Sequence, residues 1–135
     1  MYLFVYGTLR CGGINHWRIA TEVFVGSFRT TQKFYMITTR SRGVPYVSTK
    51  QMLPDTEPEE ICGEIYDVSA EVLESLDKME GSPHFYTRCL TTFFGESIVT
   101  AYVYLIESSQ ILEEICAAPV GRFVPVIGGD FIQKA

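Results

Sequence analysis

The segment from Tyr6 to His16 combines a glycine-rich turn with groups that can bind or react. It reads Tyr-Gly-Thr-Leu-Arg-Cys-Gly-Gly-Ile-Asn-His and follows an apolar stretch at residues 1–5. Because Gly7 has no Cβ, it can form a sharp turn and let a ligand approach the main chain, which leaves the amides of Thr8 and Leu9 free to donate hydrogen bonds. The segment therefore predicts an anion-binding loop, with a plain turn at the end of a strand as the alternative.

A second candidate group is Glu80, at the end of a predicted helix. Ser69 suits the N-cap position, and Gly81 suits the position that ends a helix, so we expect a helix over residues 69–79. Its apolar stripe consists of Val72, Leu73, Leu76 and Met79. Glu80 follows this stripe at an interval of four, so its carboxylate projects toward the core. Burial and the negative end of the helix dipole both disfavour its charge, which prepares it for acid–base chemistry near neutral pH. The alternative is a solvated glutamate at a frayed helix end.

Cysteine and histidine chemistry has weaker support. The four cysteines are far apart and form no Cys-x-x-Cys pair, so we expect reduced thiols. The only histidines, His16 and His84, have no second ligand at a helical or hairpin spacing, so neither a metal nor another cofactor is expected. A thiolate–imidazole pair of Cys11 and His16 stays open as the less favoured alternative.

Composition limits the class of protein. The chain has 135 residues, of which 47% are hydrophobic and 13% aromatic, so we expect one folded domain over residues 1–135. A net charge of -5 without a basic run argues against nucleic acid and anionic membranes as partners and leaves small molecules. No apolar run approaches the ~20 residues that cross a bilayer, so a cytoplasmic location is expected. The oligomeric state is left open.

Most of the chain reads as strands. Alternation or apolar runs predict strands at residues 1–6, 23–28, 33–38, 44–48, 61–68, 87–94 and 98–106. Residues 93–97 predict a tight hairpin with glycine at the bend. Asn15 is expected to cap a short helix that packs Trp17 and Ile19. Ile111, Leu112 and Ile115 have helical spacing, and an irregular tail is expected after Pro119. This pattern predicts a curved, mixed sheet with a few short helices, an α+β fold.

Two motifs resemble those of one family. Val5-Tyr6-Gly7-Thr8-Leu9-Arg10, followed by Gly12 and Asn15-His16, resembles the N-terminal signature of the gamma-glutamylcyclotransferase-like (AIG2-like) superfamily. Residues 76–88 resemble its second signature, in which an acidic residue ends a helix and Tyr-x-Arg follows. Asn15-His16 and the Glu-x-x-Pro-x-x-Tyr-x-Arg spacing from Glu80 to Arg88 most resemble the gamma-glutamylamine cyclotransferase branch. The resemblance covers about residues 1–105 and implies a small mixed β-barrel. Val44-Pro45-Tyr46 resembles an apolar-Pro-aromatic segment of the family and is expected to shape the pocket wall.

The resemblance also implies a reaction. It implies a cofactor-independent cyclotransferase that converts gamma-glutamylamines, such as gamma-glutamyl-epsilon-lysine, to 5-oxoproline and a free amine. The substrate's α-amine attacks its own side-chain carbonyl, and Glu80 is the expected proton carrier. The expected substrate contacts are Tyr6, Gly7, Thr8, Leu9 and Tyr86. Arg88 is expected to be structural, and Tyr102 and Tyr104 are assigned to the core.

The leaving group is the least determined part of this reading. Gamma-glutamyl amino acids are one alternative substrate class, and the removal of a gamma-glutamyl protecting group in a biosynthetic pathway is another. A third alternative is a non-catalytic module that binds a gamma-glutamyl metabolite, because a fold does not fix a function.

Overall fold

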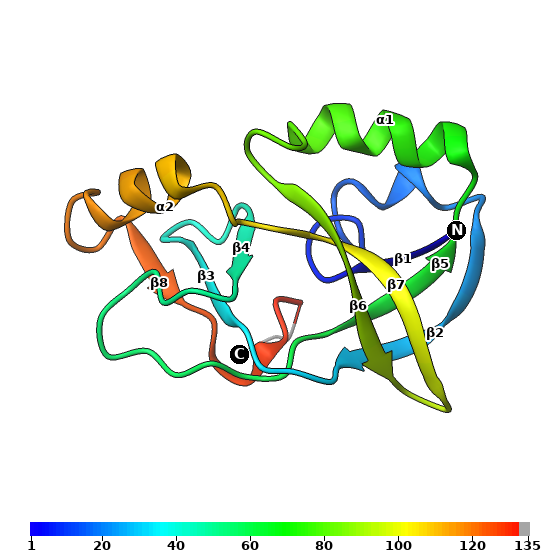
Figure 1. The fold of residues 1–135 in the computed structure, drawn as a ribbon, viewed down its shortest axis with the longest axis horizontal. Helices are drawn as coiled ribbons and strands as arrows, with labels where there is room; N and C mark the ends of the chain where they lie inside the picture. Colours follow the sequence, from blue (N-terminus) through cyan, green and yellow to red (C-terminus); the bar gives the residue numbers. More distant parts are fainter. Residues whose placement is uncertain (133–135) are drawn as a thin grey trace.

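The computed structural model describes residues 1–132 and contains two β-sheets (Figure 1). Five strands close into a barrel in the order β1-β5-β2-β6-β7. They are β1 (Tyr2–Val5), β2 (Val23–Thr30), β5 (Cys62–Asp67), β6 (Thr87–Phe94) and β7 (Ile98–Leu105). The second sheet has the order β4-β3-β8 and comprises β3 (Tyr35–Thr39), β4 (Pro45–Ser48) and β8 (Phe123–Pro125). The helices are α1 (Ala70–Glu80), α2 (Ser109–Cys116) and the short 3-10 segments η1 (His16–Arg18) and η2 (Ile127–Gly129).

The barrel closes through its first strand. Leu3 of β1 pairs with Tyr66 of β5 in an antiparallel ladder and with Tyr102 of β7 in a parallel one. The β6–β7 hairpin pairs Phe94 with Ile98, which confirms the bend expected at residues 93–97. The α+β fold with a small mixed barrel is therefore confirmed. The single domain over residues 1–135 stays a prediction, and residues 133–135 lie outside the described range.

Alternation along β1 divides the core into two clusters. Leu3 and Val5 belong to the cluster that packs beneath α1, together with Leu73 and Leu76 of that helix. Phe4 and Tyr6 point to the opposite face, where Phe4 stacks on Phe93 with ring centroids 4.2 Å apart. Since Tyr6 and Gly7 follow β1 directly, the barrel fixes where the glycine-rich loop begins.

Local signals define both ends of α1. The Ser69 hydroxyl accepts a hydrogen bond from the Val72 amide at 3.2 Å, and Gly81 adopts the left-handed conformation with φ 67°. The Gly81 amide donates to the carbonyls of Asp77 and Lys78. The predicted helix is confirmed, and it extends one residue further so that Glu80 is its last residue.

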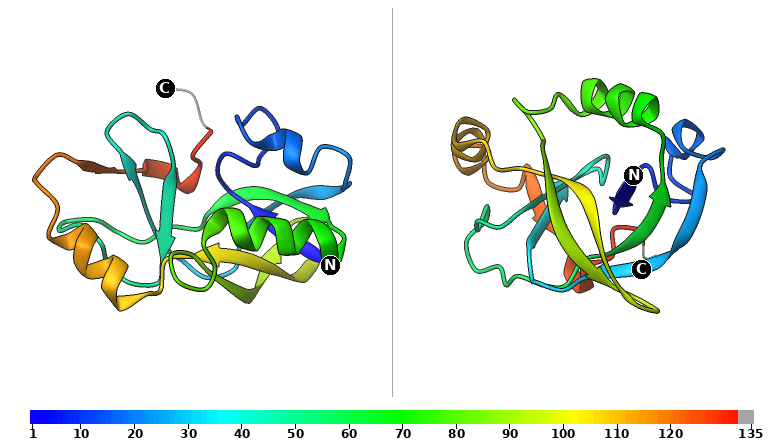
Figure 2. Two further views of the ribbon diagram at one scale, coloured as in Figure 1. Left: turned by 90° about the horizontal axis from the view of Figure 1, so that it is seen from above. Right: turned by 45° about the vertical axis from the view of Figure 1, so that its right-hand side comes forward.

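The three-stranded sheet and α2 lie beside the barrel (Figures 1 and 2). The two parts are joined where β7 ends, because the Ile106 amide donates to the Val47 carbonyl of β4 at 2.7 Å. This bond places Pro45 and Tyr46, which precede Val47 on β4, next to the mouth of the barrel. The one cis peptide bond in residues 1–132 joins Ser82 and Pro83, so the bond before Pro45 is trans.

Three expectations from the sequence are wrong. The segment after Pro119 is not wholly irregular, because residues 123–125 form β8 and pair with β3. Asn15 does not cap η1, because its side-chain amide donates to Thr8 Oγ1 at 3.0 Å. Ile19 is fully buried, but the Trp17 side chain is 68% exposed. In the described part of the chain, each helix is too short or too polar to cross a bilayer.

Candidate active site

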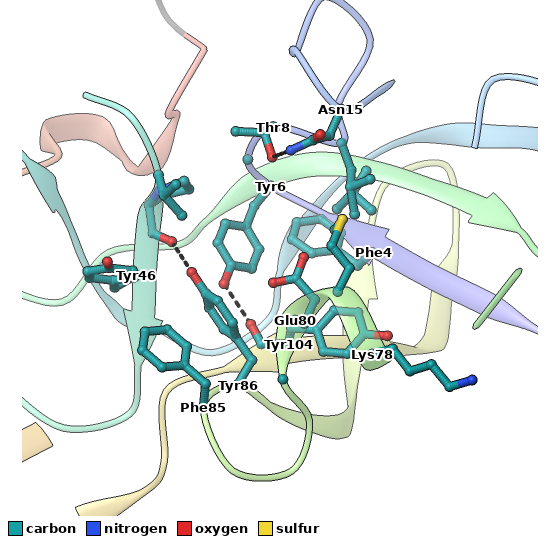
Figure 3. A pocket seen from close by; sticks show the side chains of 17 residues that line it. Phe4, Tyr6, Thr8, Asn15, Tyr46, Lys78, Glu80, Phe85, Tyr86 and Tyr104 are labelled. Atoms are coloured by element: carbon teal, nitrogen blue, oxygen red, sulfur yellow. Dashed lines mark hydrogen bonds between the residues drawn. The ribbon is translucent and has the colours of Figure 1, made fainter. Parts of the chain in front are cut away.

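A cavity of about 420 Å³ opens between the loop after β1, the C-terminal end of α1 and strand β4 (Figure 3). All six residues proposed from the sequence line it, although they come from three separate segments. These residues are Tyr6, Gly7, Thr8, Leu9, Glu80 and Tyr86. Val44, Pro45 and Tyr46 form part of the wall, as expected. The fold therefore brings both motifs to one place.

Glu80 supplies the acid of the cavity. Its carboxylate points inward beside Tyr6, whereas Lys78 extends away (Figure 3). No hydrogen bond or ion pair within residues 1–132 engages this carboxylate. Burial raises the pKa of Glu80 from 4.5 to about 7, although the positive charge of Arg18 opposes the rise. A carboxyl group with a pKa near neutral can both accept and return a proton at physiological pH.

Three buried tyrosines surround Glu80, and each hydroxyl donates a hydrogen bond. Tyr6 donates to the Tyr104 carbonyl at 2.6 Å, and Tyr86 donates to the Pro45 carbonyl at 2.8 Å (Figure 3). Tyr104 donates to Asp77 Oδ1 at 2.7 Å. Burial is the main cause that raises the pKa of all three hydroxyls, so they stay protonated near neutral pH. Glu80 is therefore the group of this cluster that can change its charge. Assigning Tyr104 to the core alone was wrong, because it also lines the cavity.

Gly7 makes room for the cavity wall. A Cβ on this residue would lie 2.6 Å from Pro45 Cγ and 3.0 Å from Pro45 Cδ. Gly7 is not among the glycines with positive φ, so close packing against the proline ring, and not an unusual backbone angle, requires glycine here. This corrects the conformational reason given from the sequence.

The loop after Gly7 presents main-chain donors. The Arg10 amide donates to the Gly7 carbonyl at 3.0 Å, and the Asn15 amide donates to the Thr8 carbonyl at 2.9 Å. Among the residues that the structure describes, neither the Thr8 amide nor the Leu9 amide has an acceptor. Two such amides on the edge of a cavity form a site for a carboxylate or an oxyanion.

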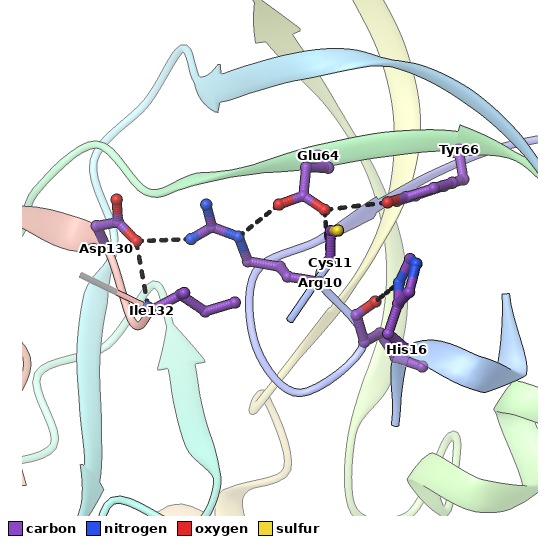
Figure 4. Close-up of polar contacts among 8 residues, drawn as sticks. Arg10, Cys11, His16, Glu64, Tyr66, Asp130 and Ile132 are labelled. Carbon is purple, nitrogen blue, oxygen red and sulfur yellow. Dashed lines mark hydrogen bonds and ion pairs between the residues drawn. The ribbon is translucent and has the colours of Figure 1, made fainter. Parts of the chain in front are cut away.

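A buried polar network holds this loop from behind (Figure 4). Arg10 Nε lies 2.9 Å from Glu64 Oε2, and Arg10 Nη1 lies 2.6 Å from Asp130 Oδ1. Glu64 Oε1 accepts hydrogen bonds from the Cys11 amide at 2.9 Å and from the Tyr66 hydroxyl at 3.1 Å. The network ties the loop to β5 and to the C-terminal segment, so the loop is held in place before any ligand binds.

Residues 3–120 of the chain match the family model described as gamma-glutamyl cyclotransferase, AIG2-like. The chain belongs to this family. It is 32% identical over 117 residues to a protein of Methanocaldococcus jannaschii that is provisionally named a gamma-glutamylcyclotransferase, and the match covers 84% of this chain and 91% of that protein.

Two mammalian members of the family are also similar. The gamma-glutamylaminecyclotransferase of Rattus norvegicus is 32% identical over 92 residues, which is 64% of this chain and 59% of the rat protein. The crystal structure of an AIG2-like protein from Mus musculus superposes with a TM-score of 0.67 at 25% identity, covering 82% of this chain and 81% of that one.

The remaining sequence candidates lie outside the cavity. Cys11 is exposed and does not line it, and His16 Nδ1 lies 2.9 Å from the Leu9 carbonyl oxygen, so no Cys11–His16 pair forms. Arg88 pairs with Asp77 at 3.3 Å and stacks over Tyr102 at 4.6 Å. These contacts anchor the end of α1 to the barrel. They also hold Asp77, the acceptor of the Tyr104 hydroxyl.

Sequence reasoning missed two groups that act on the site from outside the cavity. Arg18 carries the positive charge that opposes burial at Glu80, and its Nε is buried without a hydrogen-bond partner in the described residues. Glu64 is 7% exposed and organises the network behind the loop. Neither belongs to a short motif, so only the fold shows that they lie near the site.

Proposed function

We propose that this protein is a cyclotransferase that releases 5-oxoproline and a free amine from gamma-glutamylamines, with Glu80 as its general acid and base. The observation that carries the proposal is the buried carboxyl of Glu80, with a pKa of about 7, beside a loop with open main-chain amides. Membership of the gamma-glutamyl cyclotransferase family supports the reaction type.

The reaction requires proton transfer and positioning. The substrate's α-ammonium gives a proton to Glu80, and the resulting amine nitrogen attacks the γ-carbonyl carbon to close a five-membered ring. The bond from this carbon to the leaving nitrogen then breaks, and the leaving amine takes the proton from Glu80. Water is neither consumed nor released. General acid–base catalysis of this kind contributes about 10²- to 10⁴-fold, and a fixed cyclising conformation supplies much of the rest.

The loop after β1 is the proposed anchor for the substrate. The amides of Thr8 and Leu9 bind the α-carboxylate, which fixes the α-amine beside Glu80. Tyr6 and Tyr86 line the space for the glutamyl side chain, and their hydroxyls already donate to carbonyls of the protein. They act as rigid walls and leave proton transfer to Glu80.

The similarity to a rat gamma-glutamylaminecyclotransferase supports amines as leaving groups. The archaeal relative supports the wider class of gamma-glutamyl substrates as the second candidate. A binding module without catalysis is less favoured, because a module that only binds has no need of a carboxyl group held near pKa 7.

Mass spectrometry of 5-oxoproline and released amine tests this function. Gamma-glutamyl-epsilon-lysine, gamma-glutamyl amino acids and glutathione are incubated with the wild type, Glu80→Gln and Glu74→Gln. Glu74 is an exposed glutamate on the same helix and serves as the matched control. We expect product from the wild type and Glu74→Gln but not from Glu80→Gln. Activity of Glu80→Gln equal to that of the wild type contradicts the role of Glu80, and a folded wild type inert toward the whole panel contradicts the reaction.

A further inference from the structure

A second hollow of about 520 Å³ adjoins the proposed active site, and the two share the side chain of Tyr46. Thr39, Arg40 and Ser41, at and just after the end of β3, line one side of it, and residues 121–123 line the other. The β3–β4 turn therefore runs from this hollow to the wall of the first cavity, where Val44 and Pro45 lie. A ligand that passes Tyr46 moves from one hollow into the other.

The second hollow is basic. Arg40 and Arg122 line it, and no acidic side chain of the described residues does so. The guanidinium of Arg40 is held in place, because its Nε donates to the Gly121 carbonyl at 2.9 Å and its backbone amide donates to the Arg122 carbonyl at 3.1 Å. Within residues 1–132, the ion pairs of the protein involve neither Arg40 nor Arg122. Two arginines without a carboxylate partner in a chain of net charge -5 favour an anionic ligand.

The passage between the hollows is aromatic. The Tyr46 ring lies 5.9 Å from that of Phe85 on the side of the first cavity and 5.6 Å from that of Phe123 on the side of the second. In the first cavity, Tyr46 and Phe85 lie apart from Thr8 and Asn15 (Figure 3). A substrate anchored by its α-carboxylate at Thr8 therefore directs its leaving group toward Tyr46. Methylene groups suit such a wall, because they bury apolar surface against the rings.

From this arrangement, and resting on the proposed function, we propose that the second hollow binds a carboxylate at the far end of the leaving amine. The ring-to-ring distance across Tyr46 sets the length of the spacer. A carboxylate separated from the reacting nitrogen by five methylenes extends about 7 Å from it, given bonds of about 1.5 Å, and so reaches past Tyr46. The carboxylate of an α-amino acid is attached one carbon from that nitrogen and stays in the first cavity. The preferred leaving groups are thus long ω-amino acids.

Two synthetic substrates test this subsite. Gamma-glutamyl-6-aminohexanoate has the distant carboxylate, and gamma-glutamyl-hexylamine has a neutral tail of similar length. The kcat/KM values for both are measured with the wild type, Arg40→Gln, Arg122→Gln and the double variant. Lys33→Gln is the control, because Lys33 is exposed and lines neither hollow.

We expect the wild type to prefer the acidic substrate about fivefold, the scale of an accessible ion pair. Arg122→Gln and the double variant should bring this ratio toward one, and added salt should lower it in the wild type because salt screens the pair. Lys33→Gln should keep the ratio. A wild-type ratio of one, or a ratio that ignores both salt and the arginines, overturns the subsite and leaves the proposed function intact. Absence of 5-oxoproline from both substrates overturns the proposed function itself.

Discussion

Replacing Glu80 by glutamine is expected to stabilise the folded protein as the pH rises. Burial holds the pKa of Glu80 at about 7, whereas the same group in the unfolded chain titrates at the ordinary value of 4.5. Between these values the folded protein binds the proton that the unfolded chain releases, so the free energy of unfolding falls with rising pH. Below pH 4.5 both states are protonated and there is no penalty. Above pH 7 the penalty is complete.

The size of the effect follows from the pKa difference. A carboxyl group with pKa about 7 in the folded state and 4.5 in the unfolded state costs the folded protein about 3 kcal/mol once ionised. This value is a ceiling, since the side chain keeps some contact with solvent, which screens the charge. Glutamine cannot ionise and avoids this cost. The packing of its amide adds a constant offset, so the slope against pH isolates the ionisation of Glu80.

Urea unfolding at pH 5, 7 and 8.5 measures this slope. The wild type, Glu80→Gln and Glu74→Gln are compared at equal m-values, so that midpoint changes report stability. The advantage of Glu80→Gln over the wild type should grow by about 2 to 3 kcal/mol from pH 5 to pH 8.5, and Glu74→Gln should follow the wild type. A difference that stays flat across this range, or that falls with rising pH, refutes the inference that burial holds the Glu80 pKa near 7.

Three other changes probe the surroundings of Glu80. Arg18→Gln removes the charge that opposes burial, so the pKa of Glu80 should rise and the acidic limb of the kcat/KM profile should move to higher pH; a limb that stays in place contradicts that role. Gly7→Ala forces a methyl group against Pro45 and should cost about 1 to 3 kcal/mol in urea unfolding and lower kcat/KM, whereas Gly43→Ala meets ordinary contact distances and should be mild; equal effects would show that Pro45 yields. Arg10→Gln breaks a pair whose side chains are 14% and 10% exposed and should cost about 3 kcal/mol, against less than about 1 kcal/mol for Arg29→Gln in the exposed pair with Glu60; similar losses would argue against a structural role for the buried network.

Elements with local signals could be predicted from the sequence. Ser69, the apolar stripe and Gly81 act within a few residues of one another, so the helix and the position of Glu80 at its end follow from them. Strand β6 was predicted with its observed bounds, residues 87–94, because its ends coincide with a turn and a tight hairpin. Barrel closure was implied by the family resemblance alone, since the pairing of Leu3 with Tyr102 joins residues far apart in the chain.

Other features depend on contacts between distant segments. The network of Arg10, Glu64 and Asp130 joins three such segments, and none of these residues has a neighbour in sequence that reveals the pairing. Strand β8 was missed because its three residues are too few to show alternation. Tyr104 was assigned to the core on the ordinary preference of aromatic residues, and only the closed barrel shows that its ring also faces Glu80. The steric need for Gly7 likewise depends on Pro45, which lies on another strand.

The most direct test of the role of Glu80 is a comparison of its own titration with the pH dependence of catalysis. The side-chain carboxyl carbon of Glu80 is followed by NMR in protein with labelled glutamate, with the signal assigned from its loss in Glu80→Gln, and kcat/KM for 5-oxoproline release is measured over the same pH range. We predict that Glu80 titrates near pH 7 and that kcat/KM rises with the same pKa, because the free carboxylate must accept the proton of the substrate ammonium. Titration of Glu80 near 4.5, or a kinetic pKa that does not coincide with it, contradicts the proposal that this carboxyl carries the proton.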